Sequence, residues 1–256
     1  MNLFAPDLHP GKPALRRRIL LRPGADAVRG EVEDDFHHFV VTLFHDGGRI
    51  TRVTTAALRH PWTTCPAAGD LLAARLVGVP LDAVAGFDSP FSHCTHMLDL
   101  ALLAAAHAHD RAPTLYSMFV SDPDAGPRTA QLWRDDSILL DWLLDGDEVA
   151  SGPGEGRNLR QLRRWLSELP VHLQEPALAL RRVVFISAGR QFDYEARNNA
   201  SELAAQSGVC FSFQPIRAAD ALPMRGSKLD FTTSRSGPLA RWFGPDRQLL
   251  PLGEAV

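Results

Sequence analysis

Cysteine is scarce in this sequence. Only Cys65, Cys94 and Cys210 occur among 256 residues, an odd number that is too small for a disulfide scaffold. Long apolar runs are also missing: the longest, from Leu98 to Ala106, contains Asp99 and is shorter than the roughly 18 apolar residues that a membrane helix needs. The sequence therefore predicts a reduced, cytoplasmic protein with no membrane partner.

An excess of charge of one sign is absent as well. The formal net charge is −3, which gives no reason to expect nucleic acid or an anionic membrane surface as a partner. The first 13 residues lack an apolar core of the kind found in secretory signals. One basic cluster, Arg16 to Arg18, precedes Ile19 to Leu21, which predicts an exposed chain end that leads into a strand.

The first half of the chain has the pattern of an antiparallel meander. Residues 28–33 and 36–44 are rich in β-branched and aromatic side chains, and residues 49–58 continue this pattern. The Asp-Gly pair at residues 46 and 47 favours a tight hairpin turn between the second and third of these strands. Helices are then expected over residues 66–78 and 95–109, with Thr95 as the N-cap of the second.

The second half repeats this order of elements. Strands are expected over residues 114–122, 128–136 and 138–147, and helices over residues 158–170 and 175–189. The predicted fold is a single α+β domain, an antiparallel β-meander with helices packed on it. A duplicated β-β-β-α-α unit is an open possibility, with halves at residues 14–110 and 111–190 and an irregular C-terminal segment at 191–256.

Two neighbouring histidines lie in the second strand. Side chains alternate between faces along a strand, so His37 and His38 point to opposite sides of the sheet. Apolar neighbours on both faces favour the neutral imidazole, which is able to act as a general base. The alternative, a core histidine that donates to a backbone carbonyl, is equally consistent with this pattern.

The stretch "RHPWTTCP" joins the third strand to the first helix. Arg59 is a candidate for holding an anion or a phenolate, and Trp62 for stacking on an aromatic ligand. Cys65 precedes a helix N-terminus, where partial positive charge favours a thiolate. A rigid loop with a buried tryptophan and an inert cysteine explains the same residues.

The stretch "SPFSHCTHMLDL" places His93, Cys94 and His96 within four residues, directly before the second helix. Asp99 is one turn further along and is a candidate for orienting His96. A zinc site needs three or four converging ligands, and this spacing matches none of the usual structural patterns. Metal binding, metal-free acid–base chemistry and simple packing all remain open at this point.

The chain resembles a bacterial family catalogued as domain of unknown function 2889. The resemblance is carried in the first half by "RGEVEDDFHHFVVTLFHDGGRITRV", "RHPWTTCPAA", "LVGVPL" and "HCTHMLDLALLAAAHA", and in the second half by "LRRVVFISAGR", "CFSFQP" and "RGSKLDF". In this sequence the recurrent positions fall on His37, Asp46, Cys65 and the Cys94-Thr95-His96 triplet. For longer members such as this chain, the resemblance implies the breakdown of aromatic, lignin-derived phenolic compounds.

Together, these observations lead to one main hypothesis and two alternatives. The main hypothesis is an acid–base lyase without an organic cofactor, acting on a hydrophobic phenolic compound. One version of this reaction opens an aryl ether and releases a one-carbon fragment such as formaldehyde. Its candidate catalytic residues are His37, His96, Arg59, Cys94 and Cys65, and its candidate substrate contacts are His38, Trp62 and His93. The alternatives are a zinc-dependent hydrolase and a non-catalytic protein that binds an aromatic ligand. Exposed strand edges also permit a homodimer.

Overall fold

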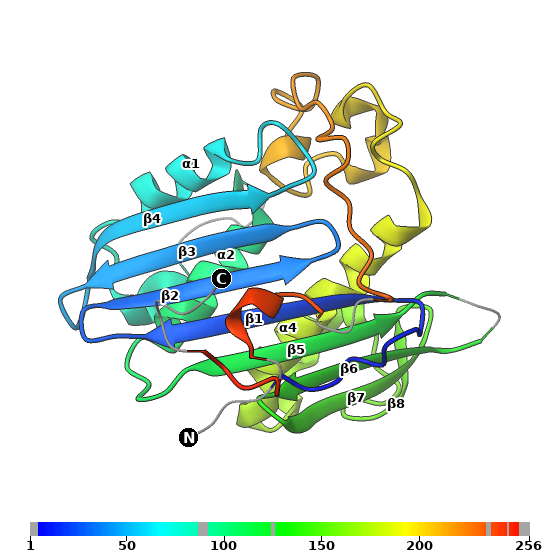
Figure 1. Cartoon of the computed structure of the whole chain (residues 1–256), viewed down its shortest axis with the longest axis horizontal. Coiled ribbons are helices and arrows are strands. Elements are labelled where there is room, and N and C mark those ends of the chain that lie inside the picture. Colours follow the sequence, from blue (N-terminus) through cyan, green and yellow to red (C-terminus); the bar gives the residue numbers. More distant parts are fainter. Residues whose placement is uncertain (1–4, 87–91, 124–125, 234–236, 245, 251–256) are drawn as a thin grey trace. The chain divides into compact units, whose positions relative to one another are not determined.

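The computed structural model describes residues 5–86, 92–123, 126–233, 237–244 and 246–250. Its strands form an eight-stranded antiparallel sheet in the order β4-β3-β2-β1-β5-β6-β7-β8, with helices packed against it (Figure 1). This is the α+β class that the sequence predicts. No helix in the described part of the chain is both long enough and apolar enough to cross a membrane.

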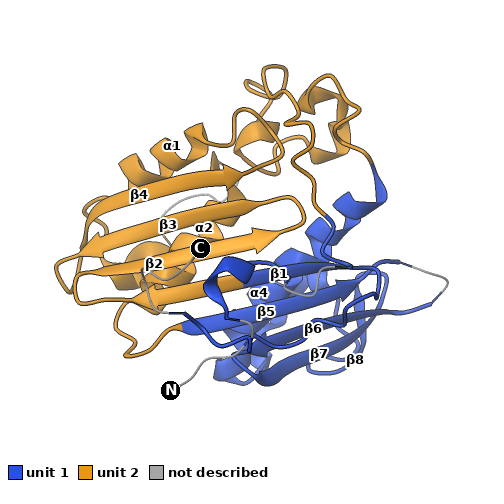
Figure 2. Cartoon of the chain, viewed as in Figure 1, with its two compact units in different colours: residues 1–18, 114–192, 230–256 blue, residues 19–113, 193–229 orange. Residues whose placement is uncertain are grey.

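The elements follow the chain in this order: β1 (Ala14–Pro23), β2 (Ala27–Asp34), β3 (His38–His45), β4 (Ile50–Arg59), α1 (Ala67–Leu76), α2 (Thr95–Ala106), β5 (Thr114–Ser121), β6 (Arg128–Arg134), β7 (Ser137–Asp145), β8 (Glu148–Ser151), α3 (Leu162–Trp165) and α4 (Val171–Ser187). The elements divide between two compact units (Figure 2). Unit 1 consists of residues 1–18, 114–192 and 230–256, and unit 2 consists of residues 19–113 and 193–229.

Unit 2 contains the predicted meander of β2, β3 and β4. Glu33 pairs with His38 in the first hairpin, and His38 pairs with Arg59 in the second. The turn between β3 and β4 is closed by Asp46, whose Oδ1 accepts hydrogen bonds from the backbone N–H groups of Gly48 and Arg49. These hydrogen bonds lower the pKa of the Asp46 carboxyl. The hairpin prediction is confirmed.

A glycine lies at the contact between each α-helix of unit 2 and the strand it packs against. A Cβ atom at Gly30 of β2 would lie 2.8 Å from Cδ1 of Leu100, and one at Gly69 of α1 would lie 2.1 Å from Oγ1 of Thr55. Only glycine permits so close an approach of α2 to β2 and of α1 to β4. The N-cap of α2 is Cys94 and not the predicted Thr95, which is the first helical residue.

Unit 1 contains a second meander, β5 to β8, with α4 packed against β5, β6 and β7. Along β7 the alternating side chains of Leu140, Trp142 and Leu144 are buried, which is the pattern of a strand with one covered face. The helix expected over residues 158–170 is mostly wrong, because only Leu162–Trp165 are α-helical and the flanking residues form 3₁₀ turns.

The arginines of β1 are not at an exposed chain end, as the sequence suggested. Arg16, Arg17 and Arg18 are 2%, 2% and 3% exposed and lie within the strand. In unit 2, residues 193–229 are irregular, as predicted, but they are held firmly against other parts of that unit. Backbone hydrogen bonds join Leu229 to Asp35 and Phe211 to His93.

Candidate active site

The candidate site begins at a tight turn between β2 and β3. The backbone N–H of Asp34 donates to the carbonyl of His37 over 2.9 Å, which closes the turn. Oδ1 of Asp34 accepts hydrogen bonds from the backbone N–H groups of Phe36, at 2.7 Å, and of His37, at 2.8 Å. This Asp34 side chain is fully buried, so the turn fixes a carboxylate inside the protein.

The same carboxylate contacts the His37 ring. Nδ1 of His37 lies 3.1 Å from Oδ1 and 3.3 Å from Oδ2 of Asp34, and the ring is 8% exposed. A carboxylate at Nδ1 favours the tautomer with the proton on Nδ1 and directs the lone pair of Nε2 away from the turn. The carboxylate also stabilises the imidazolium that forms when Nε2 takes up a proton.

The first turn of α2 brings a second histidine to this point. The ring centroids of His37 and His96 are 3.9 Å apart, with 45° between the ring planes. Phe39 of β3 lies below both rings, at 5.5 Å from His37 and 6.4 Å from His96. His96 is only partly buried, whereas His37 is buried. The structure therefore brings these two candidate residues together, which the sequence alone does not determine.

Two imidazole rings at this separation influence each other's protonation. Two positive charges so close repel strongly outside bulk water, so the state with both rings protonated is disfavoured. Such a pair can present a base and an acid side by side. The arrangement is suited to moving a proton from one atom of a substrate to another.

Arg59 holds the turn in place from the end of β4. Its Nη1 donates to the carbonyls of Asp35, at 2.8 Å, and of Ser227, at 3.2 Å. Its Nη2 donates to the carbonyls of Asp34 and His37 and lies 3.3 Å from a carboxylate oxygen of Glu33. Through these contacts Arg59 stabilises the turn that carries His37. Its predicted contact with a substrate phenolate stays a prediction.

His37 was expected within the strand but lies in the turn that precedes it, whereas His38 is the first residue of β3. Its Nε2 is 2.8 Å from Oε1 of Glu31, and its Nδ1 is 3.5 Å from Oε1 of Glu33. Glu31 also pairs with Arg29 at 2.9 Å. His38 therefore belongs to a buried polar network, which reaches the turn of His37 through Glu33 and Arg59. Its predicted role in substrate binding stays a prediction.

Trp62 belongs to an aromatic cluster that consists of Phe36, Trp62, Tyr194 and Phe213. The Trp62 ring lies 5.7 Å from Tyr194 and 5.6 Å from Phe213, and Tyr194 lies 6.2 Å from Phe36. Phe36 in turn lies 6.0 Å from His37. The cluster thus reaches the histidine pair through Phe36. Burial raises the pKa of the Tyr194 hydroxyl to about 12, so this hydroxyl is protonated at neutral pH.

Cys65 and Cys94 are buried thiols. Sγ of Cys65 lies 3.5 Å from Oγ of Ser212, and Cys94 is 6% exposed at the start of α2. Burial raises the pKa of Cys65 to about 12, and it raises the pKa of Cys94 as well. Protonated thiols are weak nucleophiles and weak metal ligands. The favourable effect of the helix N-terminus on Cys65, expected from the sequence, is therefore outweighed by desolvation.

His93 and the remaining residues of "SPFSHCTHMLDL" frame the start of α2. His93 is 1% exposed, and its carbonyl accepts a hydrogen bond from Phe211 at 3.0 Å. Ser89 to Phe91 lie outside the described residues. Among the described residues, no group of three or more histidine, cysteine, aspartate or glutamate side chains could hold a metal ion. Zinc binding stays a prediction that this donor set does not favour.

Two parts of the site were missed by sequence reasoning. Asp34 carries a detectable signal, because it ends a strand three residues before His37 in the acidic run "EDDFHH". The contribution of residues 193–229 carries no such signal, since Ser212, Tyr194 and Ser227 lie more than one hundred residues from the elements that they contact. The carboxylate that contacts His37 is Asp34, and the role of Asp99 of α2 in orienting His96 stays a prediction.

Comparisons with models of protein families, with curated proteins and with solved structures found no match for this chain. The resemblance to domain-of-unknown-function family 2889 therefore stays a prediction, as do the homodimer and the cytoplasmic location. What can be said of function rests on the geometry around His37 and His96.

Proposed function

We propose that this protein is a lyase that works by acid–base chemistry, without an organic cofactor, on a hydrophobic phenolic compound. The observation that carries the proposal is the contact between the His37 and His96 rings at 3.9 Å, with the buried Asp34 carboxylate on Nδ1 of His37. A base and an acid held next to each other, one of them oriented by a carboxylate, are the parts that such a reaction requires.

The proposed step cleaves an aryl ether that carries a neighbouring primary alcohol. His37 takes the proton of the alcohol, and the carbon–carbon bond to that CH₂O group breaks to release formaldehyde. The electron pair of this bond forms a carbon–carbon double bond to the neighbouring carbon, and the bond between that alkyl carbon and the aryloxy oxygen breaks. His96 gives its proton to the departing phenolate. No electron is lost or gained overall, so no oxidant or reductant is needed.

The roles follow from the environment of each ring. Asp34 stabilises a positive charge on His37, which suits the group that receives a proton. His96 lies on the partly exposed side of the pair, which suits the group that meets the leaving oxygen. After one turnover His37 carries the proton of the alcohol and His96 has lost its proton to the phenol, so the proton on His37 must pass to His96 before the next turnover. The contact between the rings allows this transfer through a shared water or solvent.

The phenolic substrate class is taken from the family resemblance. The aromatic cluster of Phe36, Trp62, Tyr194 and Phe213 supports it, because this cluster gives the histidine pair an apolar neighbour. Aromatic side chains favour aromatic ligands through offset-stacked and edge-to-face contacts. Apolar surroundings also strengthen the electrostatic interactions of the reacting groups.

The test is a panel of phenolic aryl ethers with a primary alcohol on the carbon next to the ether carbon. Released formaldehyde and the new phenol are measured together, and the two should form in equal amounts. The matched control substrates carry the same alcohol as its methyl ether, which has no proton to give and should release nothing. The control variant is His172→Ala, at an exposed position of α4 in unit 1.

Two other results would contradict the proposal. Saturable binding of the phenols with no product would identify a ligand-binding protein. Zinc at about one ion per chain, in protein purified without a chelator or an affinity tag, would favour the hydrolase if it were lost in the Cys94→Ser/His96→Ala variant. Our account predicts no zinc that depends on these two residues.

A further inference from the structure

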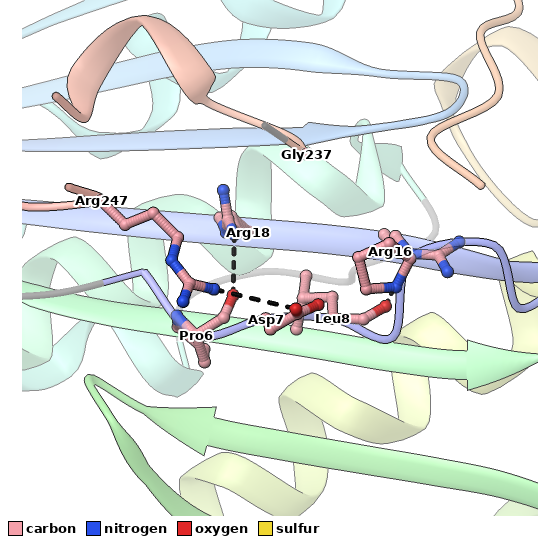
Figure 3. Close-up of a pocket in the computed structure, with 8 residues that line it drawn as sticks. Pro6, Asp7, Leu8, Arg16, Arg18, Gly237 and Arg247 are labelled. Atoms are coloured by element: carbon pink, nitrogen blue, oxygen red, sulfur yellow. Dashed lines mark hydrogen bonds and ion pairs between the residues drawn. The ribbon is translucent and has the colours of Figure 1, made fainter. Parts of the chain in front are cut away.

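A small pocket in unit 1 is lined by three arginines and one carboxylate. Arg16 and Arg18 come from β1, Asp7 from the segment before it, and Arg247 from the segment after residue 237 (Figure 3). The remaining lining is apolar or backbone, from proline, leucine and glycine residues. The pocket encloses about 10 Å³, and none of its residues belongs to the candidate active site.

The Arg16 guanidinium is fixed in position before any ligand binds. Arg16 is 2% exposed, and its Nε donates to the carbonyl of Leu8 over 2.8 Å. Its Nη2 donates to the carbonyls of His9, at 2.5 Å, and of Lys12, at 2.7 Å. A guanidinium held by so many carbonyls has one orientation. Binding of a ligand to this guanidinium therefore involves little of the loss of conformational entropy that ordering a mobile arginine would require.

Arg18 is held in the same way by both segments that form the pocket. It is 3% exposed, its Nη1 donates to the carbonyl of Pro238 at 2.9 Å, and its Nη2 donates to the carbonyl of Pro6 at 3.0 Å. A Cβ atom at Gly237 would lie 3.3 Å from Nη1 of Arg18, so the chain passes very close to this guanidinium. Two buried positive charges are thus built into the wall of one cavity.

Arg247 completes the positive side of the pocket from its exposed edge. Its Nη1 lies 3.9 Å from Oδ2 of Asp7, and these two side chains are 54% and 57% exposed. Figure 3 shows the Arg247 side chain reaching toward Asp7 across Pro6. A pair so exposed and so long contributes little on its own. The lining side chains therefore carry three positive charges and one negative charge, an excess that attracts an anion.

Backbone strain is concentrated in the two segments that form this pocket. Among the described residues, four that are not glycine have a positive φ, and His9, Leu239 and Arg247 are three of them, at 52°, 56° and 64°. Each such conformation costs free energy on the order of 1 kcal/mol or more and persists only where the surroundings enforce it. Strain of this kind clusters at ligand clamps, which agrees with a site at this place.

We propose that this pocket binds the oxyanion group, a carboxylate or a phosphate, of a small molecule. The enclosed space is about that of one water molecule, so one oxygen of the group enters and the rest of the ligand stays outside. Arg16 and Arg18 direct N–H groups to backbone carbonyls and so act on the ligand mainly through their positive charge. The planar donor fork of Arg247 matches the oxygens of a carboxylate or a phosphate better than it matches a spherical ion. Arg16 and Arg18 form the fixed wall, and Arg247 closes on the ligand from solvent.

The test is a calorimetric titration with inorganic phosphate, acetate and chloride at constant ionic strength. The whole chain is compared with Arg247→Gln and with Arg163→Gln, which removes the same charge from an exposed position of α3. We expect saturable binding of phosphate or acetate, at least tenfold weaker in Arg247→Gln and unchanged in Arg163→Gln. Tighter binding of phosphate would indicate a ligand that carries a phosphate group, and tighter binding of acetate would indicate one that carries a carboxylate.

Three outcomes would overturn the proposal. They are no saturable binding of either oxyanion to the parent chain, equal affinity in Arg247→Gln and the parent, and saturable binding of chloride alone. Arg247→Lys adds a second check, because it keeps the charge and loses the planar donor fork. Its affinity should fall between those of the parent and Arg247→Gln. Equal affinity of Arg247→Lys and Arg247→Gln would show that charge at this position has no effect on binding. That result also contradicts the proposal.

Discussion

The ring centroids of His37 and His96 lie 3.9 Å apart, although the two residues come from a turn and from a helix almost sixty positions later. Each ring arrives through a different local structure, the turn closed by Asp34 in one case and the first turn of α2 in the other. We propose that their meeting forms a proton-transferring pair, and the first three predictions below each change one support of this pair.

The first prediction concerns Asp34→Asn. The amide oxygen still accepts the two backbone hydrogen bonds of the turn, but the negative charge at Nδ1 of His37 is gone. We expect turnover to fall by about 10- to 10⁴-fold, the range seen when an orienting carboxylate is removed from an imidazole. The pH–rate profile should move to lower pH, because the imidazolium has lost its stabilising charge. A fall in rate with an unmoved profile would mean that Asp34 only supports the turn.

The second prediction concerns Arg59→Ala. Removing the guanidinium leaves the carbonyls of Asp34, Asp35 and Ser227 without this donor. We expect the free energy of unfolding to fall by roughly 2 to 4 kcal/mol, measured by urea denaturation. Arg59→Lys should restore only part of this, since an ammonium cannot reproduce the planar fork. The matched control is the exposed Arg197→Ala, which should change stability by less than about 0.5 kcal/mol. An equal loss of stability in Arg59→Ala and Arg197→Ala would contradict the claim that Arg59 stabilises the turn that carries His37.

The third prediction concerns Gly30→Ala. The added Cβ would lie 2.8 Å from Cδ1 and 3.4 Å from the backbone oxygen of Leu100, so either the Leu100 side chain must reorient or α2 must move and displace His96. We expect a loss of about 1 to 3 kcal/mol in stability together with a loss of activity. Adding Leu100→Ala gives the new methyl group room, so the double variant should recover activity relative to Gly30→Ala. If the double variant folds but recovers no activity, the loss of activity in Gly30→Ala does not come from a changed position of α2.

The fourth prediction concerns stability at alkaline pH. Burial raises the pKa of Cys65 from 9.0 to about 12 and also raises that of Cys94, so the folded protein keeps these protons above pH 9 while the unfolded chain loses them. The unfolded state then binds fewer protons, and stability must fall as pH rises, by about 1.4 kcal/mol per pH unit for each thiol. Urea unfolding at pH 8 and pH 10 should show this fall.

The matched variant for that experiment is Cys65→Ala, which removes one of the two thiols. Its stability should be lower than that of the parent at pH 8, because a buried side chain has been shortened, but it should fall less steeply between pH 8 and pH 10. The same slope in parent and variant would show that the Cys65 thiol does not keep its proton in the folded protein.

Local sequence signals predicted much of unit 2 and little of how its distant parts meet. The Asp-Gly turn at Asp46 and Gly47 depends on neighbouring residues, and it is present in the structure. The buried arginines of β1 were misread because charge alone was taken as a sign of exposure. Their carbonyl partners lie in segments that no local pattern links to the strand.

The candidate site was predictable only in its parts. His37 and His96 were both chosen, yet nothing in strand or helix periodicity sets the distance between them, which depends on how α2 packs over Gly30. The choice of Cys65 as a reactive thiol followed from its place before α1. Burial against Ser212, a residue from the irregular segment, has the larger effect on that thiol.

The most direct test of the account is turnover by His37→Ala, His96→Ala and the double variant, followed as formaldehyde released from a phenolic aryl ether. We predict that each single substitution lowers kcat by about 10²- to 10⁴-fold. The kcat of the double variant should be only slightly lower than that of the less active single variant, because the two rings act as a unit. His172→Ala should match the parent. Release of formaldehyde at the parent rate by either single variant, in a correctly folded protein, would contradict the account.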